Sequence, residues 1–341
     1  MRAELEMPAS DLTANISFFE NLGFRLDHIY PSEDPAVARM SGHDMLIRLE
    51  RGADIPAPVL YLLTANDHSE VQAPNGCIVR FRAADFKLNQ PATVHKFELR
   101  QLRDGAPWVI GRAGMHYRDL IPDRLGGSII ASHIRIPEAG PVPDVVHYHT
   151  IGFQLIYCYK GWVKLVYEDQ GPPFILHAGD CVTQPPKIRH RVLEASENLE
   201  VIEIGVPAEH MTTVDHEMEL PNNRYQPERE FEGQIFCHHQ LKDAEWVADQ
   251  AFEFRNTGVD KATKGIADVR VWRNTDSSAS QNLQHQSDIY FCFLLKGTGE
   301  LVVNGEQYGL HEGDAFVMPP EQPFSLKNQG NEMQLLQVSL S

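Results

Sequence analysis

The chain has few cysteines and no long apolar run, and both absences narrow its class. Its cysteines are odd in number and widely spaced along 341 residues: Cys77, Cys158, Cys181, Cys237 and Cys292. That pattern is typical of reduced thiols in a cytoplasmic protein and not of a disulfide framework. The residues after Met1 lack the apolar stretch of a signal peptide, and no segment is long enough to span a bilayer. We therefore expect a cytoplasmic protein with no membrane partner.

Positive charge and nucleotide-binding motifs are also scarce. The 30 Lys and Arg residues are outnumbered by 47 Asp and Glu residues, which gives a formal net charge of -17. This charge would repel nucleic acids and anionic membrane surfaces. The sequence has neither a Gly-rich phosphate loop nor a Gly-x-Ser-x-Gly elbow, so kinase, NTPase and serine-hydrolase functions have no support. A small molecule is the expected substrate or ligand.

What the sequence does contain is a set of regularly spaced histidines. His147 and His149 alternate, and Gln154 follows after four residues. Alternate side chains of a strand share a face, so the two histidines point the same way. Gln154 then returns on a neighbouring strand, and His190 arrives from a later hairpin. These four side chains are predicted to hold one divalent cation, and the spacing does not choose among Fe(II), Mn, Ni, Cu and Zn.

The same residues resemble the signature of the cupin family. His-x-His, four residues, Gln154, six residues and Gly161 are similar to the first cupin motif, and Gly179, Pro185 and His190 to the second. Gln154 stands where most members carry glutamate, and Lys187 stands where they carry glycine. The resemblance implies a metal-binding jelly roll, with a three-histidine set like that of some cupin oxygenases that cleave carbon–carbon bonds. Because an amide leaves the cation more positive than a carboxylate would, we expect a substrate enolate or carboxylate to complete the site.

The second half of the chain repeats this domain without its metal ligands. Tyr159-Lys160-Gly161 matches Leu295-Lys296-Gly297, and the run 176–180 matches 310–314. Carried across, the four ligand positions hold Leu283, His285, Tyr290 and Phe324. Residues 155–168 and 289–303 are rich in β-branched and aromatic types around turn residues, which favours strands. We therefore predict a mainly β protein with two double-stranded β-helix (cupin jelly-roll) domains, a bicupin whose second domain lacks metal.

The N-terminal residues predict a small α+β module in the order βαβββ. Its helix is expected at 11–22, with Gly23 as the stop. The segment resembles one module of the glyoxalase/bleomycin-resistance (vicinal oxygen chelate) fold, but Met7 and Pro8 lie where that family places a metal-binding histidine. We expect no chemistry here, and an exposed sheet edge that favours a homodimer or docking on a cupin domain. The predicted domains are 1–65 (this module), 66–95 (a connection), 96–220 (metal-binding cupin) and 221–341 (degenerate cupin).

Three further residues are candidates for the substrate pocket. Cys158 shares the face of Gln154 on its strand, so it either lines the cavity or is a small buried hydrophobe. His133 and Arg135 share a face on an earlier strand. If that face points inward, Arg135 would clamp a substrate carboxylate, and if it points outward, Arg135 is a surface residue.

The function predicted from these features is that of a mononuclear metal-dependent bicupin enzyme. An Fe(II) dioxygenase acting on a small oxygen-rich or aromatic acid is favoured, because three histidines on one side of the ion leave positions open for substrate and dioxygen. One alternative is a redox-neutral isomerase or lyase that uses Zn, Mn or Ni. A second alternative is a non-catalytic cupin that binds a small molecule or a metal. No catalytic residue apart from the ligands is identified.

Overall fold

The computed structural model describes residues 1–341 except 66–68, 85–86, 275, 277–278 and 331. The chain forms two compact units, Met1–Lys87 and Leu88–Ser341. All five cysteines are free. Within the described ranges, no helix has both the length and the apolar character that a membrane span requires.

The first unit has the predicted βαβββ order at its start. Helix α1 (Leu12–Asn21) is capped by the Asp11 carboxylate, which accepts a hydrogen bond from the Ala14 amide. The sheet has the order β1-β4-β3-β2, and β1 and β4 are parallel. Its strands are β1 (Leu5–Pro8), β2 (Arg25–Tyr30), β3 (Val37–Gly42) and β4 (Met45–Glu50).

A second sheet of the first unit corrects the expectation that 66–95 is only a connection. Its strands are β5 (Val59–Thr64), β6 (Glu70–Gln72) and β7 (Ile78–Ala83), in the order β5-β7-β6. The parallel β5–β7 pair and the antiparallel β6–β7 pair repeat the β1-β4-β3 arrangement. Leu60, Leu62 and Val79 share one apolar core with Met7 and Phe19. These strands therefore belong to the core of the first unit. Their short apolar runs lie among turn residues, which is why the sequence pattern indicated a connection.

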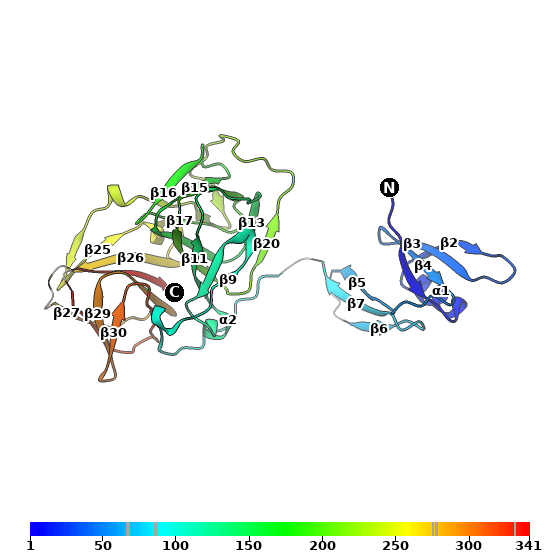
Figure 1. The fold of residues 1–341 in the computed structure, drawn as a ribbon, viewed down its shortest axis with the longest axis horizontal. Helices are drawn as coiled ribbons and strands as arrows, with labels where there is room; N and C mark the ends of the chain where they lie inside the picture. The colour runs from blue at the N-terminus through cyan, green and yellow to red at the C-terminus, as the bar shows by residue number, and fades with distance from the viewer. Residues whose placement is uncertain (66–68, 85–86, 275, 277–278, 331) are drawn as a thin grey trace. The chain divides into compact units, whose positions relative to one another are not determined.

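The second unit begins with a sandwich of two sheets, the first jelly roll (Figure 1). The seven-stranded sheet has the order β23-β17-β14-β19-β11-β10-β9, with β9 (Val109–Ile110), β10 (His116–Asp119), β11 (Ile130–Ile136), β14 (Phe153–Lys160), β17 (Cys181–Thr183), β19 (Leu199–Val206) and β23 (His238–His239). The facing sheet has the order β16-β15-β18-β13-β20, with β12 beside β18: β12 (Gly140–Pro141), β13 (His147–Thr150), β15 (Trp162–Tyr167), β16 (Phe174–His177), β18 (His190–Ala195) and β20 (Met211–Val214).

The second jelly roll repeats this plan. Its seven-stranded sheet, β24-β25-β26-β33-β28-β31-β8, contains β8 (Glu98–Arg100), β24 (Val247–Asp249), β25 (Phe252–Asn256), β26 (Ala267–Asn274), β28 (Ile289–Lys296), β31 (Ala315–Val317) and β33 (Met333–Leu340). Its smaller sheet, β27-β32-β29-β30, contains β27 (Ser280–Leu283), β29 (Thr298–Val303), β30 (Glu306–His311) and β32 (Phe324–Asn328). Short elements link these strands: η1 (Leu102–Asp104), η2 (Arg112–Gly114), α2 (Arg124–Gly127), β21 (Glu230–Phe231), β22 (Gln234–Ile235), η3 (Leu241–Asp243) and α3 (Val259–Ala262).

The two jelly rolls exchange strands. Strand β8, near the start of the unit, pairs with β31 of the second jelly roll, and β23 from the linking region pairs with β17 of the first. Two arginines fasten the exchange in matching positions: Arg118 donates to the Gly313 carbonyl, and Arg255 donates to the Gly179 carbonyl, each at 2.7 Å. Both guanidinium groups are almost fully buried. The predicted boundary between 220 and 221 therefore does not divide the structure cleanly. Strand β8, from before the boundary, belongs to a sheet of the second jelly roll, and β23, from after it, belongs to a sheet of the first.

One apolar core joins the two large sheets. Leu155 and Tyr157 of β14 and Phe291 and Phe293 of β28 belong to the same buried cluster. Alternate residues of these strands therefore face the other jelly roll, while the remaining residues face the interior of their own. This alternation determines which side chains reach the cavity of the first jelly roll.

Candidate metal centre

Three buried histidines meet inside the first jelly roll. His147 on β13 lies directly opposite His190 on the antiparallel strand β18, and His149 is two residues further along β13. The ring centroids are 4.3 Å apart for His147 and His190, and 5.2 Å from His149 to each of the others. One ligand atom from each ring lies within 4.8 Å of the other two. The predicted convergence of the three imidazoles is therefore present.

The hydrogen bonds of the three rings leave the cation-binding nitrogens free. Nδ1 of His147 and of His190 donates to the carbonyls of Val145 and Ile188, at 2.7 and 2.9 Å. Nδ1 of His149 is hydrogen-bonded to the Thr212 hydroxyl at 2.9 Å. Such contacts fix the tautomer and direct Nε2 at a metal. Nε2 of His147 is buried without a hydrogen-bond partner, which is the state expected of a metal ligand seen without its ion.

Electrostatics also favour the neutral rings that a metal needs. Burial lowers the pKa of His147, His149 and His190 below that of an ordinary histidine. Mutual repulsion between the rings lowers the pKa of His149 and His190 further. The three residues fit a divalent cation that accepts nitrogen ligands, such as Fe(II), Mn, Ni or Zn.

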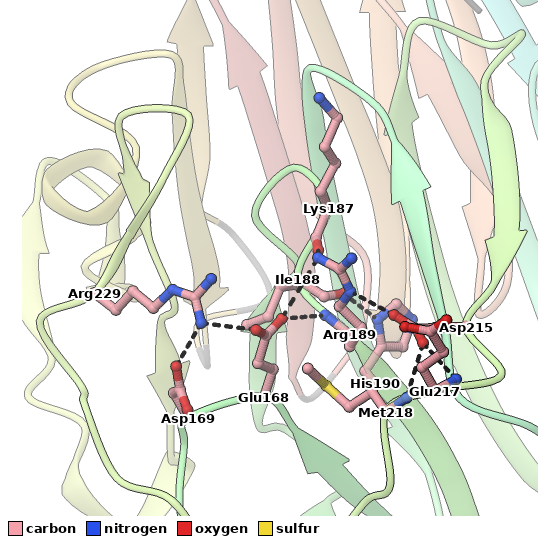
Figure 2. A network of polar contacts seen from close by, with 10 residues as sticks. All are labelled: Glu168, Asp169, Lys187, Ile188, Arg189, His190, Asp215, Glu217, Met218 and Arg229. Carbon is pink, nitrogen blue, oxygen red and sulfur yellow. Dashed lines mark hydrogen bonds and ion pairs between the residues drawn. The ribbon is translucent and has the colours of Figure 1, made fainter. Parts of the chain in front are cut away.

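An ionic network holds the turn from which His190 enters the site (Figure 2). Glu168 accepts a hydrogen bond from the Arg189 backbone amide at 3.2 Å and another from Arg229 at 2.7 Å. On the other side, the Arg189 side chain pairs with Asp215 at 3.0 Å. Arg189 does not line the cavity beside the histidines, and its guanidinium lies over the Tyr148 ring. Its contacts with Glu168 and Asp215 position the strand that carries the ligand.

The fourth predicted ligand, Gln154, lies beside an acid that the sequence analysis did not single out. Gln154 is 1% exposed, and its amide nitrogen donates to Glu203 Oε1 on β19 at 2.6 Å. Its own oxygen, Oε1, is buried without a hydrogen-bond partner. Burial raises the pKa of Glu203, whereas the bond from Gln154 and the charges of His210 and Arg112 oppose that rise. Glu203 is deep in the protein yet remains accessible from the cavity.

The cavity next to the histidines has a volume of about 330 Å³ and mostly apolar walls. Its lining includes Ile130, Ile134, Ile136, Ile156, Leu165 and Val192. Polar residues also line the cavity, among them Ser132, Gln184 and Glu203, and Arg112 of η2 brings a positive charge. Arg112 pairs with the buried carboxylate of Asp144, which also accepts a hydrogen bond from the Val192 amide. This ion pair ties the partly exposed guanidinium to a buried carboxylate at the cavity.

The three other predicted pocket residues lie elsewhere. On β11 the even-numbered residues line the cavity, so His133 and Arg135 face the opposite side; of the two directions that the sequence left open, they do not take the inward one that substrate binding would require. His133 is buried between the jelly rolls, bonded to Glu200 and Arg118, and Arg135 donates to Asn198. Cys158 belongs to the apolar core of the first jelly roll and is not among the cavity-lining residues, and burial raises the pKa of its thiol to about 12.

The residues that the sequence analysis missed are those that carry charge into the cavity. Arg112 lies in an irregular segment before β10, where no periodic sequence pattern predicts which way a side chain points. Glu203 lies on an apolar strand, Leu199–Val206, and an acid within such a run is a signal that could have been followed. His210 contacts His149 with ring centroids 5.5 Å apart and also lines the cavity.

The second jelly roll is filled at the corresponding place. Trp272, Leu283, Tyr290 and Leu326 surround a residual space of about 10 Å³. His285, the surviving histidine, stacks on Tyr290 and is hydrogen-bonded to the Met318 carbonyl. Within the described residues, the one cluster of three or more potential metal ligands is that of the first jelly roll. That the second domain binds no metal stays a prediction, and the side chains at its ligand positions pack against one another.

Comparisons with known proteins identify the fold. The family model "Cupin domain" matches residues 274–339, within the second jelly roll. A search of curated proteins finds no match. Among solved structures, a variant of Bacillus subtilis oxalate decarboxylase is similar over 74% of this chain and 79% of its own, with 13% identity and a TM-score of 0.53.

Two other structures give the same result. Salicylate 1,2-dioxygenase from Pseudaminobacter salicylatoxidans covers 76% of this chain and 88% of its own, at 14% identity and a TM-score of 0.54. The Escherichia coli protein Ylba covers 74% and 94%, at 13% identity and a TM-score of 0.53. At such identities the likeness establishes the fold alone. The chain therefore has the cupin fold, present as two jelly rolls, with a three-histidine centre in the first.

Proposed function

We propose that the first jelly roll is the active site of a mononuclear metal-dependent enzyme, an Fe(II) dioxygenase acting on a small aromatic acid. The observation that carries the proposal is the meeting of three neutral imidazoles, with Nδ1 engaged on each, beside a cavity. Bound there, Fe(II) would supply open positions for substrate and dioxygen. Salicylate dioxygenase and oxalate decarboxylase are among the structures of similar fold, which supports metal-dependent chemistry on an organic acid.

The walls of the cavity support an aromatic acid over a small oxygen-rich one. Apolar side chains such as Ile134, Ile156 and Leu165 would contact a ring and exclude water. Arg112 would bind the carboxylate, and its contact with Asp144 would keep the guanidinium in place. A substrate polar group placed unpaired against these apolar side chains would cost about 1–3 kcal/mol.

Oxygen uptake tests the proposal. Protein reconstituted anaerobically with Fe(II) is expected to consume dioxygen when hydroxy-aromatic acids or diketones are added. His149→Ala removes one ligand and is expected to lose bound iron and turnover together. The matched control is His285→Ala in the second jelly roll, which should retain both.

Each alternative function predicts a different result. Zinc, manganese or nickel in protein purified without chelators, with no oxygen uptake, would favour an isomerase or lyase. Ligand affinity that survives His149→Ala, without turnover by the wild type, would favour a non-catalytic binding protein. Oxygen uptake unaffected by His149→Ala would contradict the proposed site.

We also propose that the N-terminal unit is a glyoxalase-like module that serves assembly as a homodimer. One face of β5 supports this role, because Val59, Tyr61 and Leu63 are 46%, 51% and 68% exposed. Among the described residues of this unit there is no cluster of three potential metal ligands. Sedimentation of the full chain and of a Tyr61→Lys, Leu63→Lys variant is expected to give a dimer and a monomer, respectively. A wild-type monomer would contradict the role.

A further inference from the structure

The pair formed by Gln154 and Glu203 is built into adjacent strands of the metal-binding jelly roll. Gln154 lies opposite Gly205 and Ile156 lies opposite Glu203, so the two polar side chains are diagonal neighbours on one face of the sheet. Ile156 and Glu203 on that face line the cavity, and Gln154 is buried beside them. The amide nitrogen of Gln154 donates to the carboxylate at 2.6 Å. Among the described residues, no cationic side chain forms an ion pair with Glu203 within 4.0 Å. Its hydrogen-bond partner is a neutral amide, whose oxygen is itself unpartnered.

The second jelly roll provides an internal comparison. There Tyr290 lies opposite Ser339 and Cys292 lies opposite Gln337, which places Tyr290 at the position of Gln154 and Gln337 at that of Glu203. Gln337 accepts hydrogen bonds from Trp272 and Tyr290, at 2.7 and 3.2 Å. The contact between the two positions is thus present in both jelly rolls. The negative charge is present only in the jelly roll that has three histidines.

A buried divalent cation held by three neutral imidazoles needs negative charge close by, because ionic charge is costly in an apolar interior. Gln154 alone cannot provide it. A carboxylate that accepts from the amide nitrogen orients the amide oxygen and makes it more negative, as carboxylates do behind metal-binding histidines. We propose that Glu203 is a positioning residue for the metal, which acts through Gln154 and supplies the charge of the carboxylate that other cupins place among the ligands.

This role rests on the proposed metal site and adds a residue that does not itself bind the ion. Glu203→Gln keeps an oxygen that accepts the same hydrogen bond but removes the charge, whereas Glu203→Leu removes both. Affinity for Co(II), measured by competition with a chelator at pH 7.5, is expected to fall by about 10-fold to 100-fold, more for leucine. The visible spectrum of bound Co(II) should also change, because the position of the amide oxygen changes.

A double-mutant cycle separates action through Gln154 from direct action on the ion. Adding Glu203→Leu to Gln154→Leu is expected to weaken Co(II) binding no further. The exchange Gln154→Glu with Glu203→Gln keeps one acid and one amide in contact, and should bind Co(II) at least as tightly as the wild type. Gln337→Leu is the matched control at the same register in the second jelly roll, and its affinity and spectrum should be those of the wild type.

The outcomes distinguish this inference from the proposed function. If Glu203→Gln and Glu203→Leu bind Co(II) as tightly as the wild type and with the same spectrum, the role of Glu203 is wrong and the metal site stands. Additive effects in the cycle, or an exchanged variant as weak as Glu203→Gln, would also overturn it. A wild type that binds no Co(II) would overturn the metal site and this inference together.

Discussion

Individual side chains decide what the centre can do. The spacing in the sequence identifies His147 and His149, which alternate on one strand, and His190, which follows a turn. Arg112 and Glu203, by contrast, are brought to the cavity by a loop and by a strand far from the histidines in the sequence. They bring opposite charges to the lining of the cavity.

Burial of the histidines predicts that the metal-free protein loses stability in acid. The pKa of His147, His149 and His190 is lower in the folded protein than in the unfolded chain, where it is about 6.5. As pH falls below 6.5, the unfolded chain takes up protons that the folded one does not. Stability present above pH 6.5 is therefore lost, by up to about 1.4 kcal/mol per pH unit for each ring.

Urea unfolding of the metal-free protein between pH 7.5 and 5 measures this loss. The midpoint should fall with pH in the wild type. The variant His190→Phe copies the residue Phe324 of the second jelly roll. Its free energy of unfolding should decline less steeply with falling pH, because one fewer proton is taken up on unfolding. Parallel pH profiles for the two proteins would contradict the assignment, whatever their difference in absolute stability.

At the scale of elements, the exchanged strands make the two jelly rolls one structure. Asp180 accepts from the Leu241 amide of η3 at 2.7 Å, and Asp314 accepts from the Leu102 amide of η1 at 2.8 Å. Each of these turns follows the strand that is exchanged, so each jelly roll is closed by a segment that comes from outside its own run of strands. The limits of each jelly roll in the sequence therefore differ from its limits in space.

Arg255 is expected to contribute strongly to this junction. In Arg255→Met, the half-buried Gly179 carbonyl and the buried Tyr157 hydroxyl lose a donor, at 2.7 and 3.2 Å, and His239 loses its partner. The free energy of unfolding should fall by about 1–3 kcal/mol in urea titrations. The control is Arg270→Met, whose partner is the partly exposed Asp268, with an expected change below about 1 kcal/mol. Equal losses would show that the buried arginine has no special role.

At the scale of the whole molecule, the two compact units have separate cores. Met7, Phe19 and Leu60 belong to a cluster drawn entirely from residues before Lys87, whereas the other clusters lie after it. A unit with its own core is expected to fold alone. The three histidines of the candidate metal centre all belong to the second unit.

Removal of the N-terminal unit is therefore expected to leave the metal site intact. A chain of residues 88–341 should bind one Co(II) with the affinity of the full-length protein, within about twofold, and unfold in a cooperative transition. Calorimetric titration and urea unfolding are the measurements. An aggregated product or a much weaker site would mean that the first unit supports the second.

The sequence by itself determined the repeated β architecture and the three histidines, because alternation along a strand and repeated turn residues are local properties. Alternation placed His147 and His149 on one face, the resemblance to the second cupin motif added His190, and the filled second jelly roll follows from Tyr290 and Phe324 at ligand positions. Tertiary structure decided the rest. The phase of β11 turned His133 and Arg135 away from the cavity, strand exchange moved β8 and β23 between jelly rolls, and pairing of β14 with β19 brought Glu203 to Gln154. The reason is that the facing of a strand and the partner of a side chain depend on which strands pair across long stretches of chain, and local pattern does not contain that information.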